Sequence, residues 1–178
     1  MKRVFAAVIP PQEAIEHLAT ALRPVRQEFG RELRWTDPDA WHLTLAFYGD
    51  QPNDVSDLGA FLARAAAMSA PLRLHLRGAG AFNSRTLWIG VGGDVRDLRE
   101  LMADCLLDPE ERHRQRAHLT VARAIPRSEW ALREVAHALA VYAGPEFRVG
   151  ELHLMESRLG EGRGGGPRYE VLDTFRLG

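Results

Sequence analysis

The sequence is poor in lysine and cysteine and has no long apolar run. Lys2 is the only lysine among 23 basic residues, and 24 acidic residues bring the formal net charge to −1. This balance excludes a polycation that coats nucleic acid by bulk charge, so a nucleic-acid ligand would have to be held locally. Cys105 stands alone, which excludes an intrachain disulfide. No window approaches the roughly 20 apolar residues of a membrane-spanning helix.

The overall composition of the chain is that of an ordinary globular protein. The chain has 178 residues, of which 46% are hydrophobic and 26% are charged, so it can bury a core. The apolar run from Val4 to Pro11 is short and reads as a first strand, not as a signal sequence. We therefore expect one domain over residues 1–178, a cytoplasmic location, a monomer and no membrane association.

Hydrophobic periodicity predicts a mixture of helices and strands. Strands are expected at residues 2–9, 33–35, 41–48, 72–76, 86–91, 118–122, 147–157 and 169–177. Helices are expected after Pro11, after a cap at Asn53 or Asp54, over residues 95–107 and after Ser128, with Trp130 on the buried face of the last. Pro24 should kink or shorten the first helix. Residues 78–84 should form a loop or bulge, and residues 160–166, five of them glycine, a mobile loop.

The order of these elements repeats. A strand, a helix and a strand carrying a His-x-Thr motif come first, and further strands, a helix and a second such strand follow. The repeat predicts an α+β fold of two antiparallel-sheet lobes, with outer helices, that are related by a pseudo-twofold axis and face each other across a central cleft.

The repeated motif is His-Leu-Thr-Φ-Ala, where Φ is Leu or Val. It occurs at His42–Ala46 and again at His118–Ala122. Strand alternation predicts that His42, Thr44 and Ala46 share one face while Leu43, Leu45 and Phe47 share the other, and that the second copy follows the same parity. A single His-x-Thr motif is weak evidence for a catalytic role. Two copies are stronger evidence, because a purely structural repeat would retain the apolar positions but not the His and Thr.

Such a quartet suits displacement at phosphorus. Histidine titrates near neutrality, so one of His42 and His118 can act as general base and the other as general acid. The hydroxyls of Thr44 and Thr120 can donate to non-bridging phosphate oxygens without a metal. The arrangement fits a five-membered cyclic phosphate as well as a linear diester.

A metal centre is the competing use of histidine. The sequence has no HxxxH or HExxH motif and no carboxylate cluster near either His-x-Thr, so we expect no metal and no cofactor. The other five histidines are predicted to be structural or solvated; they are His17, His75, His113, His137 and His153.

The two motifs and their surroundings resemble the 2H phosphoesterase superfamily, and within it the bacterial RNA 2′,3′-cyclic phosphodiesterases, also called 2′-5′ RNA ligases. The similarity covers nearly the whole chain. It is carried by residues 3–6, 41–49, 86–91, 118–123, 156–160 and 167–172.

The resemblance implies a bilobed fold and metal-independent hydrolysis of RNA 2′,3′-cyclic phosphate ends to 2′-phosphomonoesters, with reversible 2′-5′ ligation as a side activity. It implies RNA ends, such as those of tRNA halves, or nucleoside 2′,3′-cyclic phosphates as substrates. His42 would be the proton donor and His118 the acceptor, while Thr44 and Thr120 would bind the phosphate. Arg123 would also bind substrate, although strict alternation points it away from His118.

Two other functions fit the same motifs. One is a nucleotide-binding module that keeps the fold without turnover, and the other is a 2H phosphoesterase acting on another cyclic phosphate or on oligoadenylate. Arginines that could steer RNA are Arg114, Arg116, Arg163 and Arg168, and aromatic residues that could stack on a base are Trp41, Phe82 and Tyr169.

Overall fold

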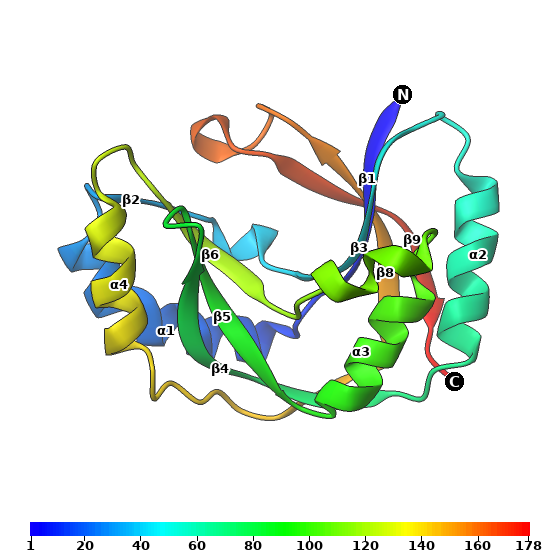
Figure 1. The fold of residues 1–178 in the computed structure, drawn as a ribbon, viewed down its shortest axis with the longest axis horizontal. Helices are drawn as coiled ribbons and strands as arrows, with labels where there is room; N and C mark the ends of the chain where they lie inside the picture. The colour runs from blue at the N-terminus through cyan, green and yellow to red at the C-terminus, as the bar shows by residue number, and fades with distance from the viewer.

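A curled antiparallel sheet forms the centre of the protein (Figure 1). The computed structural model describes residues 1–163 and 165–178. Within these residues the nine strands are β1 (Lys2–Val8), β2 (Leu33–Trp35), β3 (Leu43–Gln51), β4 (Leu72–Phe82), β5 (Thr86–Gly93), β6 (Leu119–Ala124), β7 (Phe147–Val149), β8 (Glu151–Arg158) and β9 (Arg168–Arg176). The helices are α1 (Gln12–Glu28), α2 (Ser56–Ala67), α3 (Val95–Asp104) and α4 (Glu129–Ala138), with short 3-10 turns η1 (Pro38–Ala40), η2 (Pro109–Arg114) and η3 (Arg163–Gly165).

The strand order is symmetric about the middle of the sheet. It runs β7-β4-β5-β6-β3-β1-β8-β9, with β2 paired to β6. One half therefore ends in the second motif strand, β6, and the other half ends in the first, β3. The two halves meet where Leu43 pairs with Leu119. The expected α+β fold with two pseudo-twofold-related halves is confirmed.

Helices cover the outer surface of each half (Figure 1). α1 and α4 pack on β4, whereas α2 packs on β8 and β9 and α3 packs on β3. The core between these layers is apolar and includes Leu18, Leu62, Leu101 and Leu132. Cys105 is buried within this core, and burial raises the pKa of its thiol to about 12, so the thiol stays protonated and unreactive.

Several sequence-based expectations were wrong in detail. α1 continues through Pro24 to Glu28, so the proline does not shorten the helix. The strand expected at residues 72–76 continues to Phe82 as β4, whereas the expected loop or bulge is confirmed as a bulge at Gly78 and a turn at residues 83–85. Trp130 is 50% exposed, and Ala131 occupies the buried face of α4 instead.

The largest discrepancy concerns the strand expected at residues 147–157. Gly150 divides it into β7, which pairs with β4, and β8, which pairs with β1. These two strands lie in opposite halves of the sheet, so the chain crosses from one half to the other at this glycine. The glycine-rich segment contains η3, and Gly164 lies outside the described residues.

No helix among residues 1–163 and 165–178 has both the length and the apolar character needed to span a bilayer.

Gly80 is required by close packing across the β4–β5 hairpin. A Cβ atom at this position would overlap the indole of Trp88. Gly80→Ala should therefore lower the free energy of unfolding by about 1–3 kcal/mol, the usual cost of overpacking. Gly59→Ala is the matched control: a Cβ there meets nothing closer than 3.8 Å, and alanine should stabilise α2 by about 0.5–1 kcal/mol. Urea denaturation measures both, and equal effects of the two substitutions would contradict this packing.

Candidate active site

The two motif histidines lie side by side at the centre of the sheet. His42 and His118 each precede the first residue of their strand, and those first residues, Leu43 and Leu119, are paired. The antiparallel pairing therefore brings together two side chains that are far apart in the sequence.

Both histidines and both threonines line one cavity of about 290 Å³. Its lining residues are Thr36, Ala40, His42, Thr44, His118, Thr120, Arg123, Pro167 and Tyr169. All five residues singled out from the sequence as catalytic or substrate-binding thus converge on one space. No carboxylate lines this cavity among the described residues, so its electrostatic character comes from Arg123 and the two imidazoles.

A β-bulge in each motif strand changes the parity that alternation predicts. Ala7 pairs with Thr44 and Ala6 with Ala46, which leaves Leu45 unpaired. In the second copy Trp88 pairs with Thr120 and Leu87 with Ala122, which leaves Val121 unpaired. The same extra residue therefore follows the threonine in both motifs.

Because a bulge moves the following residues to the opposite face, the predicted faces were wrong beyond the threonines. Ala46 and Ala122 join the core, whereas Phe47, expected on the core face, is 51% exposed. Arg123 comes to the cavity face for the same reason. The bulge thus explains why Arg123 faces the cavity although strict alternation predicts that it points away from His118.

Each imidazole is oriented by a backbone carbonyl two residues before it. The Nδ1 atom of His42 lies 2.8 Å from the Ala40 carbonyl oxygen, and that of His118 lies 2.7 Å from the Arg116 carbonyl oxygen. A carbonyl oxygen only accepts, so Nδ1 carries the hydrogen in both rings. This fixes the neutral tautomer and leaves both Nε2 atoms free for proton transfer.

The two rings differ in their aromatic surroundings. His42 packs against Phe5 and Tyr169, with ring centroids 4.9 Å and 4.8 Å away, and these two rings also contact each other at 5.3 Å. Burial lowers the pKa of His42, which the bond to Ala40 partly opposes and the charge of His118 reinforces. Among the described residues His118 has one aromatic neighbour, Phe82, in a T-shaped contact with ring centroids 4.9 Å apart. The neutral form of His42 is therefore favoured in the free site.

The aromatic candidates from the sequence take three different places. Trp41 is 2% exposed and belongs to the core. Phe82 stacks on Trp88 at 5.2 Å and supports His118, whereas Tyr169 lines the cavity. Sequence reasoning missed Phe5, whose position on β1 gave no signal that β1 would pair with β3.

The remaining histidines and arginines lie outside this cavity. His17 contacts the Tyr142 hydroxyl and His153 the Thr174 hydroxyl, while His113 contacts a carbonyl of its own loop. Arg163 pairs with Asp37 at 3.3 Å. Among residues 1–163 and 165–178 no three His, Cys, Asp or Glu side chains are grouped to hold a metal ion.

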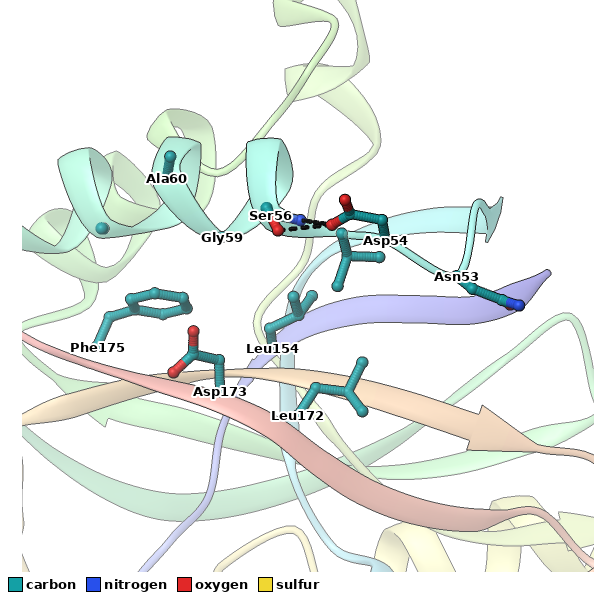
Figure 2. A pocket seen from close by; sticks show the side chains of 11 residues that line it. Asn53, Asp54, Ser56, Gly59, Ala60, Leu154, Leu172, Asp173 and Phe175 are labelled. Atoms are coloured by element: carbon teal, nitrogen blue, oxygen red, sulfur yellow. Dashed lines mark hydrogen bonds between the residues drawn. The ribbon is translucent and has the colours of Figure 1, made fainter.

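A larger cavity of about 500 Å³ lies elsewhere, between α2 and the strands β8 and β9 (Figure 2). Asp54 on its rim accepts hydrogen bonds from the backbone and hydroxyl of Ser56, and Asp173 accepts one from the backbone N–H of Thr174. Leu154, Leu172 and Phe175 form its apolar wall. Its described lining has no histidine and no arginine, so the smaller cavity is the better candidate for phosphate chemistry.

The packing of Tyr169 on His42 predicts that the pKa of His42 depends on the Tyr169 ring. The pKa of His42 should lie below its ordinary value of 6.5, and Tyr169→Ala should raise it by admitting water to the ring. Two-dimensional NMR of the imidazole signals measures this pKa directly. Tyr169→Phe keeps the ring and should leave the pKa low. A pKa for His42 that is insensitive to Tyr169→Ala would contradict burial as the cause.

Comparison with known proteins agrees with this geometry. Residues 10–161 match the 2′-5′ RNA ligase superfamily. The chain is 30% identical over 157 residues to an RNA 2′,3′-cyclic phosphodiesterase of Geobacillus stearothermophilus, covering 80% of this chain and 47% of that protein, so it spans about half the length of that relative. It is 31% identical over 194 residues to the Thermus thermophilus RNA 2′,3′-cyclic phosphodiesterase, covering 98% of this chain and 90% of that one.

A solved structure shows the same fold. The crystal structure of E. coli LigT complexed with 3′-AMP is 23% identical and superimposes with a TM-score of 0.72, covering 99% of this chain and 98% of that one. With the match over residues 10–161 and the two related phosphodiesterases, this chain belongs to the 2′-5′ RNA ligase superfamily.

Proposed function

We propose that this chain hydrolyses terminal 2′,3′-cyclic phosphates of RNA to 2′-phosphomonoesters without a metal ion. The observation that carries the proposal is the convergence of two His-Thr pairs and Arg123 on one cavity. The two superfamily relatives named RNA 2′,3′-cyclic phosphodiesterase support the substrate class. Residues 1–178 would act as one bilobed unit and as a monomer, and an RNA substrate favours a cytoplasmic location.

The chemistry follows from the two free Nε2 atoms. The water oxygen attacks phosphorus while His118 takes a proton from that water. His42 gives a proton to the ribose 3′-oxygen as the bond between phosphorus and the 3′-oxygen breaks. The 2′-oxygen keeps the phosphate. Proton exchange with solvent then restores the starting state of both rings.

The remaining polar groups would stabilise the charge that develops on phosphorus. Thr44 and Thr120 enter the cavity from the two motif strands and can donate to different non-bridging oxygens. The guanidinium of Arg123 supplies a fixed positive charge at the same place. These three groups are present before substrate arrives, so they need little reorganisation during the reaction.

An acid role for His42 requires its protonated form, which burial disfavours in the free site. The phosphate of the substrate is an anion, and an adjacent anion favours the charged imidazolium. Substrate binding should therefore raise the pKa of His42 and prepare the acid.

The first test is turnover of a nucleoside 2′,3′-cyclic phosphate in excess EDTA. Activity should persist, and His42→Ala and His118→Ala should each lower kcat by about 10²- to 10⁴-fold, the range of general acid–base catalysis. Phosphorus NMR should identify the 2′-phosphomonoester as product. His137→Ala changes an exposed histidine of α4 and should leave the rate unchanged.

Each alternative predicts a different outcome. Loss of activity in EDTA would contradict metal independence. Tight binding of a nucleoside monophosphate without turnover would identify a binding module. Turnover of another cyclic phosphate or of oligoadenylate, with none of the 2′,3′-cyclic compound, would identify a different phosphoesterase.

The pH dependence provides a second test. Above the pKa of His42 the acid is lost, so both kcat/KM and kcat fall as the pH rises. Because kcat/KM reports the free enzyme and kcat the substrate complex, the alkaline limb of kcat should lie at higher pH. Steady-state profiles on a cyclic mononucleotide measure both limbs. Coincident limbs would show that bound phosphate does not raise the pKa of the acid.

A further inference from the structure

A cationic pocket lies where the chain crosses from β7 to β8, beside the end of β9. Its volume is about 470 Å³, and its lining includes Arg148, Glu151, His153 and Arg176. We call it the Arg148–Arg176 pocket. None of these four residues lines the catalytic cavity, so the hydrolysis proposed above does not account for them.

Strand pairing places this pocket on the face of the sheet that carries the catalytic cavity. Ala7 of β1 pairs with Thr44 of β3 on one side and with His153 of β8 on the other. Residues directly opposite each other in antiparallel strands point to the same face of the sheet. His153 therefore shares the face of Thr44, which lines the catalytic cavity. Two strand spacings, about 10 Å, separate their backbones.

An apolar surface connects the two spaces. Ile9 lines the Arg148–Arg176 pocket and packs against a small buried cluster, which consists of Phe5, Ala7 and Met155. The Phe5 ring in turn contacts the His42 imidazole. His42 is the proposed proton donor to the 3′-oxygen, so the terminal ribose would lie beside it, and the rest of the RNA continues from the 5′-carbon of that ribose. The surface thus offers a path from the terminal ribose to the pocket.

The two arginines give the pocket an excess of positive charge. Arg148 in β7 and Arg176 at the end of β9 are exposed, and neither forms an ion pair among residues 1–163 and 165–178. Glu151 is the one carboxylate of the described lining, and it pairs across the strands with Arg176. Two guanidiniums thus oppose one carboxylate, and guanidinium groups match the geometry of phosphate oxygens.

We propose that the Arg148–Arg176 pocket binds a backbone phosphate of the RNA strand that carries the cyclic end, upstream of its terminal nucleotide. The inference rests on the proposed function of the catalytic cavity. The pocket takes no part in bond making or breaking. A phosphodiester is present in an oligonucleotide and absent from a cyclic mononucleotide, so the pocket would select RNA ends over free cyclic nucleotides.

The test compares hydrolysis of a 2′,3′-cyclic mononucleotide with hydrolysis of a short single-stranded oligonucleotide that ends in the same cyclic nucleotide. Arg148→Ala and Arg176→Ala should each raise the ratio of the oligonucleotide KM to the mononucleotide KM about tenfold, because each removes a charge-assisted hydrogen bond to phosphate. The oligonucleotide kcat should not fall, since the contact is the same in the ground state and the transition state. Steady-state kinetics on the chain of residues 1–178 measure both constants.

Two further measurements sharpen the test. Glu151→Gln removes the opposing carboxylate and should lower the oligonucleotide KM, a gain that a folding defect would not produce. In the double variant of Arg148→Ala and Arg176→Ala, the slope of log kcat/KM against log salt for the oligonucleotide should shrink by about 0.7, the value for one phosphate contact to a single strand. Arg133→Ala removes an exposed arginine of α4 and should leave both substrates unaffected.

The contrary outcomes are distinct. Equal changes in KM for the two substrates, or no change for the oligonucleotide, would overturn the proposal. The pocket would instead be a site for free phosphate if inorganic phosphate altered mononucleotide turnover in the wild type but not in the double variant, with the oligonucleotide KM the same in both.

Failure of the proposed function would be recognised separately, because the wild type would then hydrolyse neither substrate. Fluorescence anisotropy of a labelled single-stranded oligoribonucleotide ending in a 2′-phosphate decides the role of the pocket in that case. Its Kd should still rise in the double variant, and an unchanged Kd would overturn the RNA-binding role.

Discussion

The pairing of Leu43 with Leu119 is the constraint on which the site depends. It joins the two halves of the sheet and places the residue before each leucine, His42 or His118, at the junction. Everything else at the site is local to one half: each strand brings its own threonine and its own carbonyl partner for the imidazole.

The bulges show where sequence reasoning reaches its limit. Alternation correctly places His42 with Thr44 and His118 with Thr120, because these residues precede the bulges. It fails at Phe47 and at Arg123, since no composition signal distinguishes a bulged Leu45 or Val121 from an ordinary apolar residue. The repeated motif could be recognised in the sequence. The register between each motif strand and the strand paired with it depends on tertiary structure, which the sequence pattern does not show.

The same distinction holds for the fold. The α+β class, the two equivalent halves and most strands follow from periodicity and from the repeat. The separation of β7 from β8 could not be predicted, because Phe147–Val149 and Glu151–Arg158 carry similar apolar patterns on both sides of Gly150. Which partner strand each one finds depends on long-range packing. Tyr169 likewise reaches His42 only because β9 follows β8 along that half of the sheet.

The carbonyl partners of the two imidazoles have an electrostatic consequence. Many catalytic histidines are oriented by a carboxylate, which adds a full negative charge beside the ring. Here the neutral main-chain carbonyl oxygens of Ala40 and Arg116 orient the two imidazoles. The site thereby fixes both tautomers without placing an anion next to the place where the phosphate would bind. Since each carbonyl lies two residues from its histidine, this orienting group is encoded within the motif segment itself and accompanies it in both copies.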